Sequence, residues 1–193
     1  MYPYNEQPQP HQNNELFGHL DKISSFLNEG FVWHKAAANA CRKFAVRGWG
    51  RLHDCQADCD SDELICFEKI LCDKLNYCPK FNFNRLPQYA QLTINSMDEF
   101  KNHHTVWIAR ESEIIPTLNA AIHLARTIDI ELYRKLCDML ERVQGEIMRV
   151  NMIVDNLNFT GWNTHDVSVK SKWLHEQCEK GDIKGHNINA NLG

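Results

Sequence analysis

The chain has 193 residues, of which 43% are hydrophobic and 24% charged, and its formal net charge is −4. This length suits one domain with a core of its own. The slightly acidic balance excludes the clustered basic surface of a nucleic-acid-binding protein. No run of 18 apolar residues is present, so no membrane partner is expected, and the first residues lack the basic-then-apolar order of a secretory signal. We therefore expect a cytoplasmic protein.

Three parts are expected along the chain. Residues 1–15 are rich in Gln, Asn and Pro, a composition typical of a flexible tail. Residues 16–159 carry the apolar periodicity of long helices. Residues 160–193 read as a polar C-terminal extension with one short amphipathic helix over 167–178.

The first long helix is expected from Leu16 to about Val46, with Gly30 marking a local break because glycine weakens helices. The second occupies most of the segment from Arg47 to Pro79, since a proline ends a helix at or before the preceding residue. The third is expected over residues 96–126 and the fourth over 130–158. Four long helices with a long connection between the second and third predict an all-α four-helix bundle with a crossover.

Two features of the third helix can be read from its sequence. Ser96 followed by Glu99 fits a capping box, and Pro116 is expected to kink or split the helix. His103 and His104 lie near its start, where a pair of histidines is usually solvated.

Cysteines are concentrated in the second helix, where Glu63 and Cys66 lie three residues apart on the same face. In a reducing compartment, cysteines are thiols or metal ligands rather than disulfides. The paired Cys-x-x-Cys spacing of zinc sites is absent. His53 and its neighbouring cysteines are therefore expected to act independently, with Cys55 and Cys59 as an alternative pair of zinc ligands.

The order and spacing of many residues in this bundle resemble bacterioferritin, a member of the ferritin-like superfamily. The resemblance extends from near Leu27 to near Leu157. It is carried by Leu27-Asn28-Glu29, Trp49-Gly50, Leu52, Asp62-Glu63, Ile70-Leu71, Pro79, Glu111, Leu118, Ala121-Ile122, Ala125, Met139-Leu140 and Gly145. It implies a ferritin-like four-helix bundle that binds Fe(II) and oxidises it by a ferroxidase-type reaction within a hollow homo-oligomer.

The resemblance also implies metal ligands. Di-iron bundles place one Glu on each of two helices and a Glu-x-x-His on each of the other two. Glu63 matches the bridging carboxylate of the second helix, and Glu111 matches the carboxylate of the third. In the first helix either Glu29 or His34 fills the ligand position, and the spacing of the residues that follow favours His34.

Three positions depart from the family pattern. Cys66 stands where the family has a metal-binding His, Val143 stands where the fourth helix offers its bridging Glu, and Glu146 stands where its His lies. Without the bridging carboxylate, a complete pair of irons is not expected. One ion remains, iron or alternatively zinc. The predicted ligands are His34, Glu63, Cys66, Glu111 and Glu146.

Leu64 replaces the haem-binding methionine of the family, so no haem is expected. Two other functions stay open. The departures favour a non-catalytic ferritin-like module for assembly or protein contacts, and the cysteine-rich helix allows a thiol-based metal or redox sensor.

Overall fold

The computed structural model describes residues 10–89 and 91–180, and its elements in that part of the chain are helices. They are α1 (Pro10–Lys43), α2 (Arg47–Leu75), α3 (Leu86–Tyr89), α4 (Met97–Glu113), α5 (Ile115–Ala125), α6 (Ile130–Thr160) and α7 (Thr164–Lys180). Within these residues, no helix is both long enough and apolar enough to cross a membrane. Residues 1–9 of the predicted tail and 181–193 of the predicted extension lie outside the described residues.

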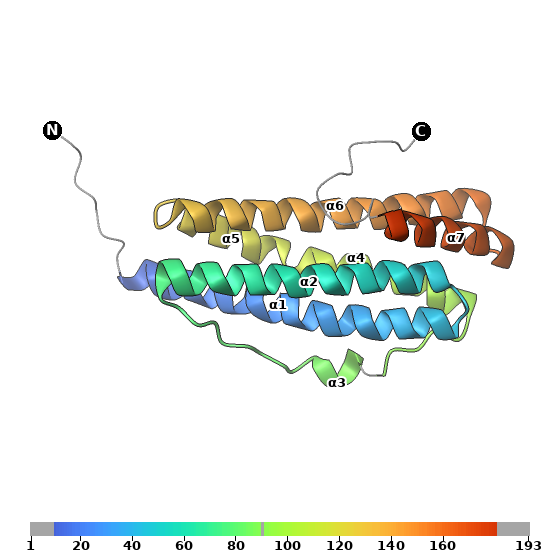
Figure 1. Ribbon diagram of the computed structural model, residues 1–193, viewed down its shortest axis with the longest axis horizontal. Coiled ribbons are helices and arrows are strands. Elements are labelled where there is room, and N and C mark those ends of the chain that lie inside the picture. Colours follow the sequence, from blue (N-terminus) through green and yellow to red (C-terminus); the bar gives the residue numbers. More distant parts are fainter. Residues whose placement is uncertain (1–9, 90, 181–193) are drawn as a thin grey trace.

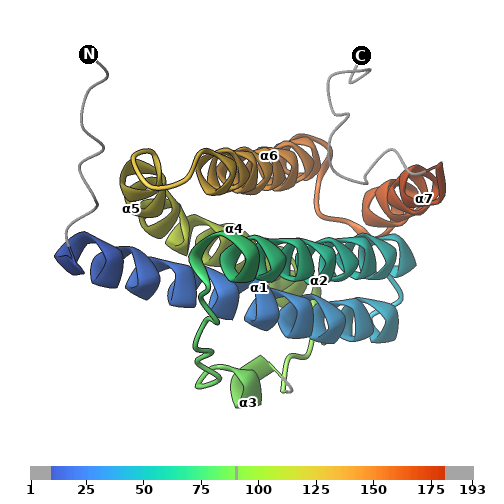
Figure 2. The ribbon, with the colours of Figure 1, turned by 60° about the vertical axis from the view of Figure 1, so that its left-hand side comes forward.

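A four-helix bundle with a long crossover forms the body of the molecule (Figure 1). Its helices are α1, α2, α6 and the consecutive pair α4 and α5. The crossover, described over residues 76–89 and 91–96, runs back along the bundle and carries the short helix α3 on the α1 side (Figure 2). It returns the chain to the end at which α2 begins, so α4 runs in the same direction as α2. The predicted all-α architecture is confirmed.

Helix α1 differs from the sequence expectation in two ways. It begins at Pro10, inside the segment expected as a tail, and it passes through Gly30 without a break. A Cβ atom on Gly30 would lie 2.2 Å from Asp60 Oδ2 and 2.8 Å from Arg110 Nη2. Glycine at this position therefore lets polar side chains of α2 and α4 approach the α1 backbone.

The breaks between the other helices follow local sequence signals. Helix α2 ends at Leu75, and Asn76 caps it in the left-handed conformation with φ 47°. The Ser96 hydroxyl accepts a hydrogen bond from the Glu99 backbone N–H at the start of α4. The third helix splits at Ile114, directly before the turn that contains Pro116, as the sequence predicts.

Two apolar clusters fill the two halves of the bundle. One gathers residues from the C-terminal half of α1, the start of α2, α4 and the end of α6, with Trp33, Trp49 and Trp107 at its centre. The other gathers residues from the N-terminal half of α1, the end of α2, α5 and the start of α6. The helix segments between these clusters carry buried polar side chains, which form a polar layer across the bundle.

Helix α7 packs against α2 and α6 and lengthens the first cluster. Val167 and Leu174 are buried in that cluster. The Gly48 backbone N–H donates to the Ser171 hydroxyl at 2.8 Å, and a Cβ atom on Gly48 would lie 1.6 Å from the Ser171 carbonyl oxygen. The docking of α7 on α2 thus requires glycine at position 48.

We expect Gly48→Ala to lower the free energy of unfolding by about 2–3 kcal/mol, because the added methyl group must push α7 off α2. Gly145→Ala is the matched control, since a Cβ atom there has no neighbour within 4 Å. That control should stabilise the protein by about 0.5–1 kcal/mol through helix propensity. Urea unfolding followed by circular dichroism measures both changes. Equal stability of Gly48→Ala and wild type would contradict the described packing of α7.

Candidate metal centre

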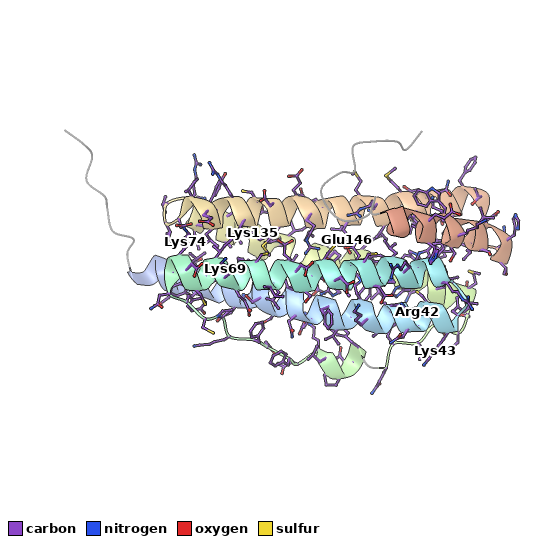
Figure 3. The ribbon with its side chains drawn as sticks, viewed as in Figure 1. Arg42, Lys43, Lys69, Lys74, Lys135 and Glu146 are labelled. Carbon is purple, nitrogen blue, oxygen red and sulfur yellow. The ribbon has the colours of Figure 1, made fainter. Side chains whose placement is uncertain are left out.

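The polar layer contains one ligand-type side chain from each of the four long helices of the bundle. They are His34 on α1, Asp60 on α2, Glu111 on α4 and Glu146 on α6, and each is at most 3% exposed. Glu146 lies near the middle of the bundle, between α6 and α2 (Figure 3). Burial of three acids at one level of a bundle is costly unless cations or hydrogen bonds compensate them.

The imidazole of His34 is the meeting point of these acids. Its Nε2 atom lies 3.6 Å from Glu146 Oε1, 3.9 Å from Glu111 Oε1 and 3.9 Å from Asp60 Oδ2. Ligand atoms of His34, Glu111 and Glu146 all lie within 4.8 Å of one another. Asp60 Oδ2 is buried and has no hydrogen-bond partner. A buried carboxylate oxygen without a partner, close to a histidine nitrogen, is a feature that a bound cation would explain.

Two guanidinium groups compensate part of the buried negative charge. Arg142 Nη2 lies 3.1 Å from Asp60 Oδ1, its Nε lies 2.9 Å from Glu63 Oε2, and its Nη1 lies 3.7 Å from Glu146 Oε2. Arg110 pairs with Glu111 and donates to the Phe26 carbonyl oxygen at 3.0 Å. Arg142 therefore occupies the space between carboxylates of α2 and α6.

The layer contains one more acidic side chain than it has basic partners. Asp60, Glu111 and Glu146 face the two guanidinium groups, while Glu63 has Lys135 as a further partner. Burial, followed by the charge of Glu146, raises the pKa of Glu111. Burial likewise raises the pKa of Asp60, against the opposing effect of Arg142. Because burial is the larger cause of both shifts, each of these carboxyl groups favours a bound proton, and a bound cation would take the place of that proton.

Hydrogen bonds fix the orientation of the side chains in this layer. Trp107 Nε1 donates to Glu146 Oε1 at 2.7 Å. His34 Nδ1 lies 2.9 Å from His53 Nδ1, and His53 Nε2 lies 2.9 Å from His103 Nε2. Burial lowers the pKa of all three imidazoles, so each ring is neutral, with one nitrogen that donates and one that accepts. Partners of this kind hold a ligand histidine in one orientation.

The structure brings three of the five predicted ligands together, namely His34, Glu111 and Glu146. Glu63 lies at the edge of the layer and pairs with Lys135 and Arg142. Cys66 is exposed. Sequence reasoning missed Asp60, although it lies one helical turn before Glu63 on nearly the same face.

The prediction for His103 and His104 was wrong, because they are only 5% and 1% exposed. His104 is a structural residue. Its Nε2 accepts from Trp49 Nε1 at 2.7 Å and its Nδ1 donates to the Phe100 carbonyl oxygen at 2.9 Å, which uses both ring nitrogens.

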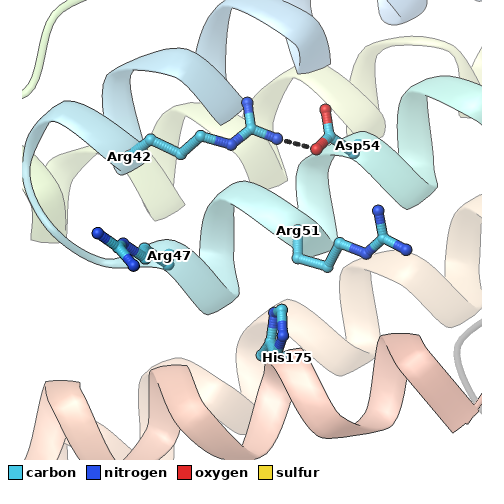
Figure 4. A pocket seen from close by; sticks show the side chains of 5 residues that line it. All are labelled: Arg42, Arg47, Arg51, Asp54 and His175. Carbon is cyan, nitrogen blue, oxygen red and sulfur yellow. Dashed lines mark hydrogen bonds and ion pairs between the residues drawn. The ribbon is translucent and has the colours of Figure 1, made fainter.

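An open surface pocket of about 660 Å³ lies at the end of the bundle where α1 ends, and α1, α2 and α7 line it (Figure 4). Arg42, Arg47, Arg51, Asp54 and His175 line it. Asp54 pairs with Arg42. This pocket has a single carboxylate beside three guanidinium groups, so it lacks the chemistry of a cation site.

Comparison with known proteins identifies the fold. No protein-family model matches the chain, and no curated protein matches it in sequence. A solved structure of an open-pore ferritin from the hyperthermophilic archaeon Archaeoglobus fulgidus matches it with a TM-score of 0.67 and 11% identity, over 88% of this chain and 98% of that one. A structure from the engineering of a closed form of the same ferritin gives a TM-score of 0.66 and 10% identity, over 88% and 97% of the two chains. At these identities the likeness shows the fold, and the predicted ferritin-like fold is confirmed.

Removal of the buried guanidinium of Arg142 should destabilise the cation-free protein severely. We expect Arg142→Met to lower the free energy of unfolding by about 3–5 kcal/mol, because three carboxylates lose their shared counter-ion. Arg85→Met is the matched control. Arg85 pairs with Glu113 at 2.6 Å, but both side chains are about half exposed, so the loss should be below about 1 kcal/mol. Chemical denaturation in the presence of a chelator measures both. A loss for Arg142→Met as small as that of the control would show that the layer does not depend on this cation.

Proposed function

We propose that this chain, which has the ferritin-like fold, is an iron-handling protein that binds one Fe(II) ion in its polar layer. One observation carries the proposal: an imidazole nitrogen lies within 3.9 Å of carboxylate oxygens from three other helices. The ligands would be His34, Glu111 and Glu146, with Asp60 as a fourth. Iron is the substrate here, and the protein supplies the ligands.

The donor set suits Fe(II). Carboxylate and imidazole groups are the ligands that non-haem iron prefers. The lowered pKa of His34 leaves its ring neutral, as metal binding requires. The Asp60 Oδ2 atom, which has no hydrogen-bond partner, would gain the ion as a partner, and the ion would compensate the buried carboxylates. Trp107 would hold the Glu146 carboxylate and His53 would hold the His34 ring in the binding orientation.

A pair of irons does not fit the same layer. The Arg142 guanidinium lies among Asp60, Glu63 and Glu146, where carboxylates would have to reach a second ion. Val143 is buried in an apolar cluster and offers no ligand. Arg142 already supplies the positive charge that a second cation would bring. We therefore propose that each chain binds one ion.

We also propose that copies of the chain assemble into a homo-oligomer. Met148, Met152 and Phe159 on α6 are 55%, 42% and 92% exposed. Large apolar side chains grouped on one outer surface are typical of protein interfaces. An iron-handling function would use such an assembly to enclose the metal.

A second candidate function is a ferritin-like scaffold without metal. Arg110 and Arg142 favour it, because they already compensate most of the negative charge in the polar layer. In this alternative the layer is an ionic cross-link between the four helices.

Anaerobic titration of the full chain with Fe(II) distinguishes the two functions. We expect one equivalent to bind through the carboxylates, and we expect Glu146→Gln and His34→Gln each to lose it, because each removes a ligand while keeping the side chain polar. Cys66→Ser is the control and should bind as wild type does, since Cys66 is exposed. Absence of a carboxylate-dependent equivalent would overturn the iron proposal and leave the scaffold. Two equivalents that both depend on Glu146 would overturn the single-ion stoichiometry.

Sedimentation velocity tests the assembly. The double variant Met148→Glu/Phe159→Glu should shift the protein towards the monomer, because charged groups would have to be buried at the interface. Gln88→Glu adds charge on the exposed surface of α3 and should leave the distribution unchanged. A monomeric wild type would refute the oligomer.

A further inference from the structure

A second group of ligand-type side chains lies outside the polar layer. Ligand atoms of Cys41 on α1, His53 on α2 and His103 on α4 all lie within 4.8 Å of one another. The three residues are 0%, 0% and 5% exposed. They lie within or beside the apolar cluster centred on Trp33, Trp49 and Trp107, and Trp33 stacks on the His103 ring at 5.2 Å.

This group repeats the polar layer at another level of the bundle. Cys41 follows His34 by seven residues, His53 precedes Asp60 by seven, and His103 precedes Glu111 by eight. Seven residues are about two helical turns, or about 10 Å along the axis. Each of the three helices therefore presents a second ligand-type side chain on its inner face. The added residue follows the first ligand on α1 and precedes it on α2 and α4, because α1 runs in the opposite direction to the other two.

The fourth helix does not continue the pattern. One and two turns after Glu146, α6 contributes Val150 and Ile153, both buried in the apolar cluster. The second group thus has three protein ligands, and its fourth side is apolar. Its surroundings contrast with the polar layer, where each helix supplies a polar side chain.

The chemistry of the donors differs as well. A thiolate with two neutral imidazoles selects soft and borderline cations, whereas carboxylates select hard ones. Burial lowers the pKa of His103 to about 3, so the ring is neutral, and it raises the pKa of the Cys41 thiol to about 12. A cation must therefore displace the thiol proton, as happens when metals bind buried cysteines.

We propose that Cys41, His53 and His103 form a second metal site, separate from the carboxylate centre, that takes a d¹⁰ cation, Cu⁺ or Zn²⁺. The ligand atoms of one tetrahedral ion lie about 3.5 Å apart, so the group closes around an ion by side-chain rotation. His53 Nε2 and His103 Nε2 already face each other at 2.9 Å. When the ion binds between them, the proton of that contact moves to the other nitrogen of its own ring, so both imidazoles stay neutral, and the Cys41 thiol proton is released to solvent. Cu⁺ with a thiolate gives a neutral site, which suits the apolar surroundings better than the residual charge that Zn²⁺ leaves.

Thiolate ligation gives the test a signal that the carboxylate centre cannot produce. The full-length protein, freed of metal under anaerobic conditions, is titrated with Co²⁺ as a spectroscopic substitute for Zn²⁺, and separately with Cu⁺ against a competing chelator. We expect one equivalent of Co²⁺ with a thiolate-to-cobalt charge-transfer band. Competition by Zn²⁺ and the affinity for Cu⁺ then distinguish the two cations.

Four variants locate the signal. Cys41→Ser and His103→Gln should abolish the charge-transfer band. Cys137→Ser should retain it, because Cys137 lies on α6 between members of the other apolar cluster. Glu146→Gln should also retain it, so the second site can be present even if the proposed Fe(II) centre is absent. A band that survives Cys41→Ser would place the metal on another thiol and overturn the proposal.

X-ray absorption of the wild type loaded with Cu⁺ or Zn²⁺ needs no variant and covers the case in which Cys41→Ser does not fold. One sulfur and two imidazole nitrogens in the first shell are expected. A first shell without sulfur, one with several sulfurs, or no metal bound at all would overturn the site.

Discussion

The bundle depends on how it compensates the acids buried at its middle. Asp60, Glu111 and Glu146 meet where the two apolar clusters end, and a guanidinium group reaches each of them. An unpaired carboxylate in such surroundings would be protonated or would unfold the protein. The contacts of Arg142 join α2 to α6, and those of Arg110 join α4 to the α1 backbone at Phe26. The charged side chains that make the layer suitable for a cation therefore also hold these helices together.

The helices could be predicted from the sequence because their signals are local. Apolar periodicity, the Ser96 cap and Pro116 each act within a few residues, and the structure agrees with them. The break predicted at Gly30 was wrong, because α1 is continuous there and the reason for a glycine lies in other helices. Asp60 and Arg110 approach the α1 backbone at that position, and propensity alone does not describe such a contact.

The candidate site was less predictable, since it depends on how each helix is rotated within the bundle. Asp60 and Glu63 share one face of α2, and only the packing decides that Asp60 points to His34 while Glu63 pairs with Lys135. The burial of His104 likewise comes from distant segments. Trp49 bonds to it, and the Trp162 ring, in the connection between α6 and α7, lies 5.4 Å from its ring. From the sequence alone, a histidine near a helix start is expected to be solvated, because the distant segments that bury His104 are known only from the fold.

The row His34, His53 and His103 has a direction. Each pair of facing ring nitrogens holds one proton, because one nitrogen must donate and the other must accept. An ion on His34 Nε2 leaves the proton of that ring on Nδ1, and the proton of His53 must then lie on Nε2, towards His103. An ion on His53 Nε2 requires the opposite arrangement, with the proton of His34 on Nε2, towards the carboxylates. If both proposed ions were bound, His34 Nδ1 and His53 Nδ1 would each carry a proton and face each other, so one further proton would have to leave. Binding at one end of the row would therefore weaken binding at the other.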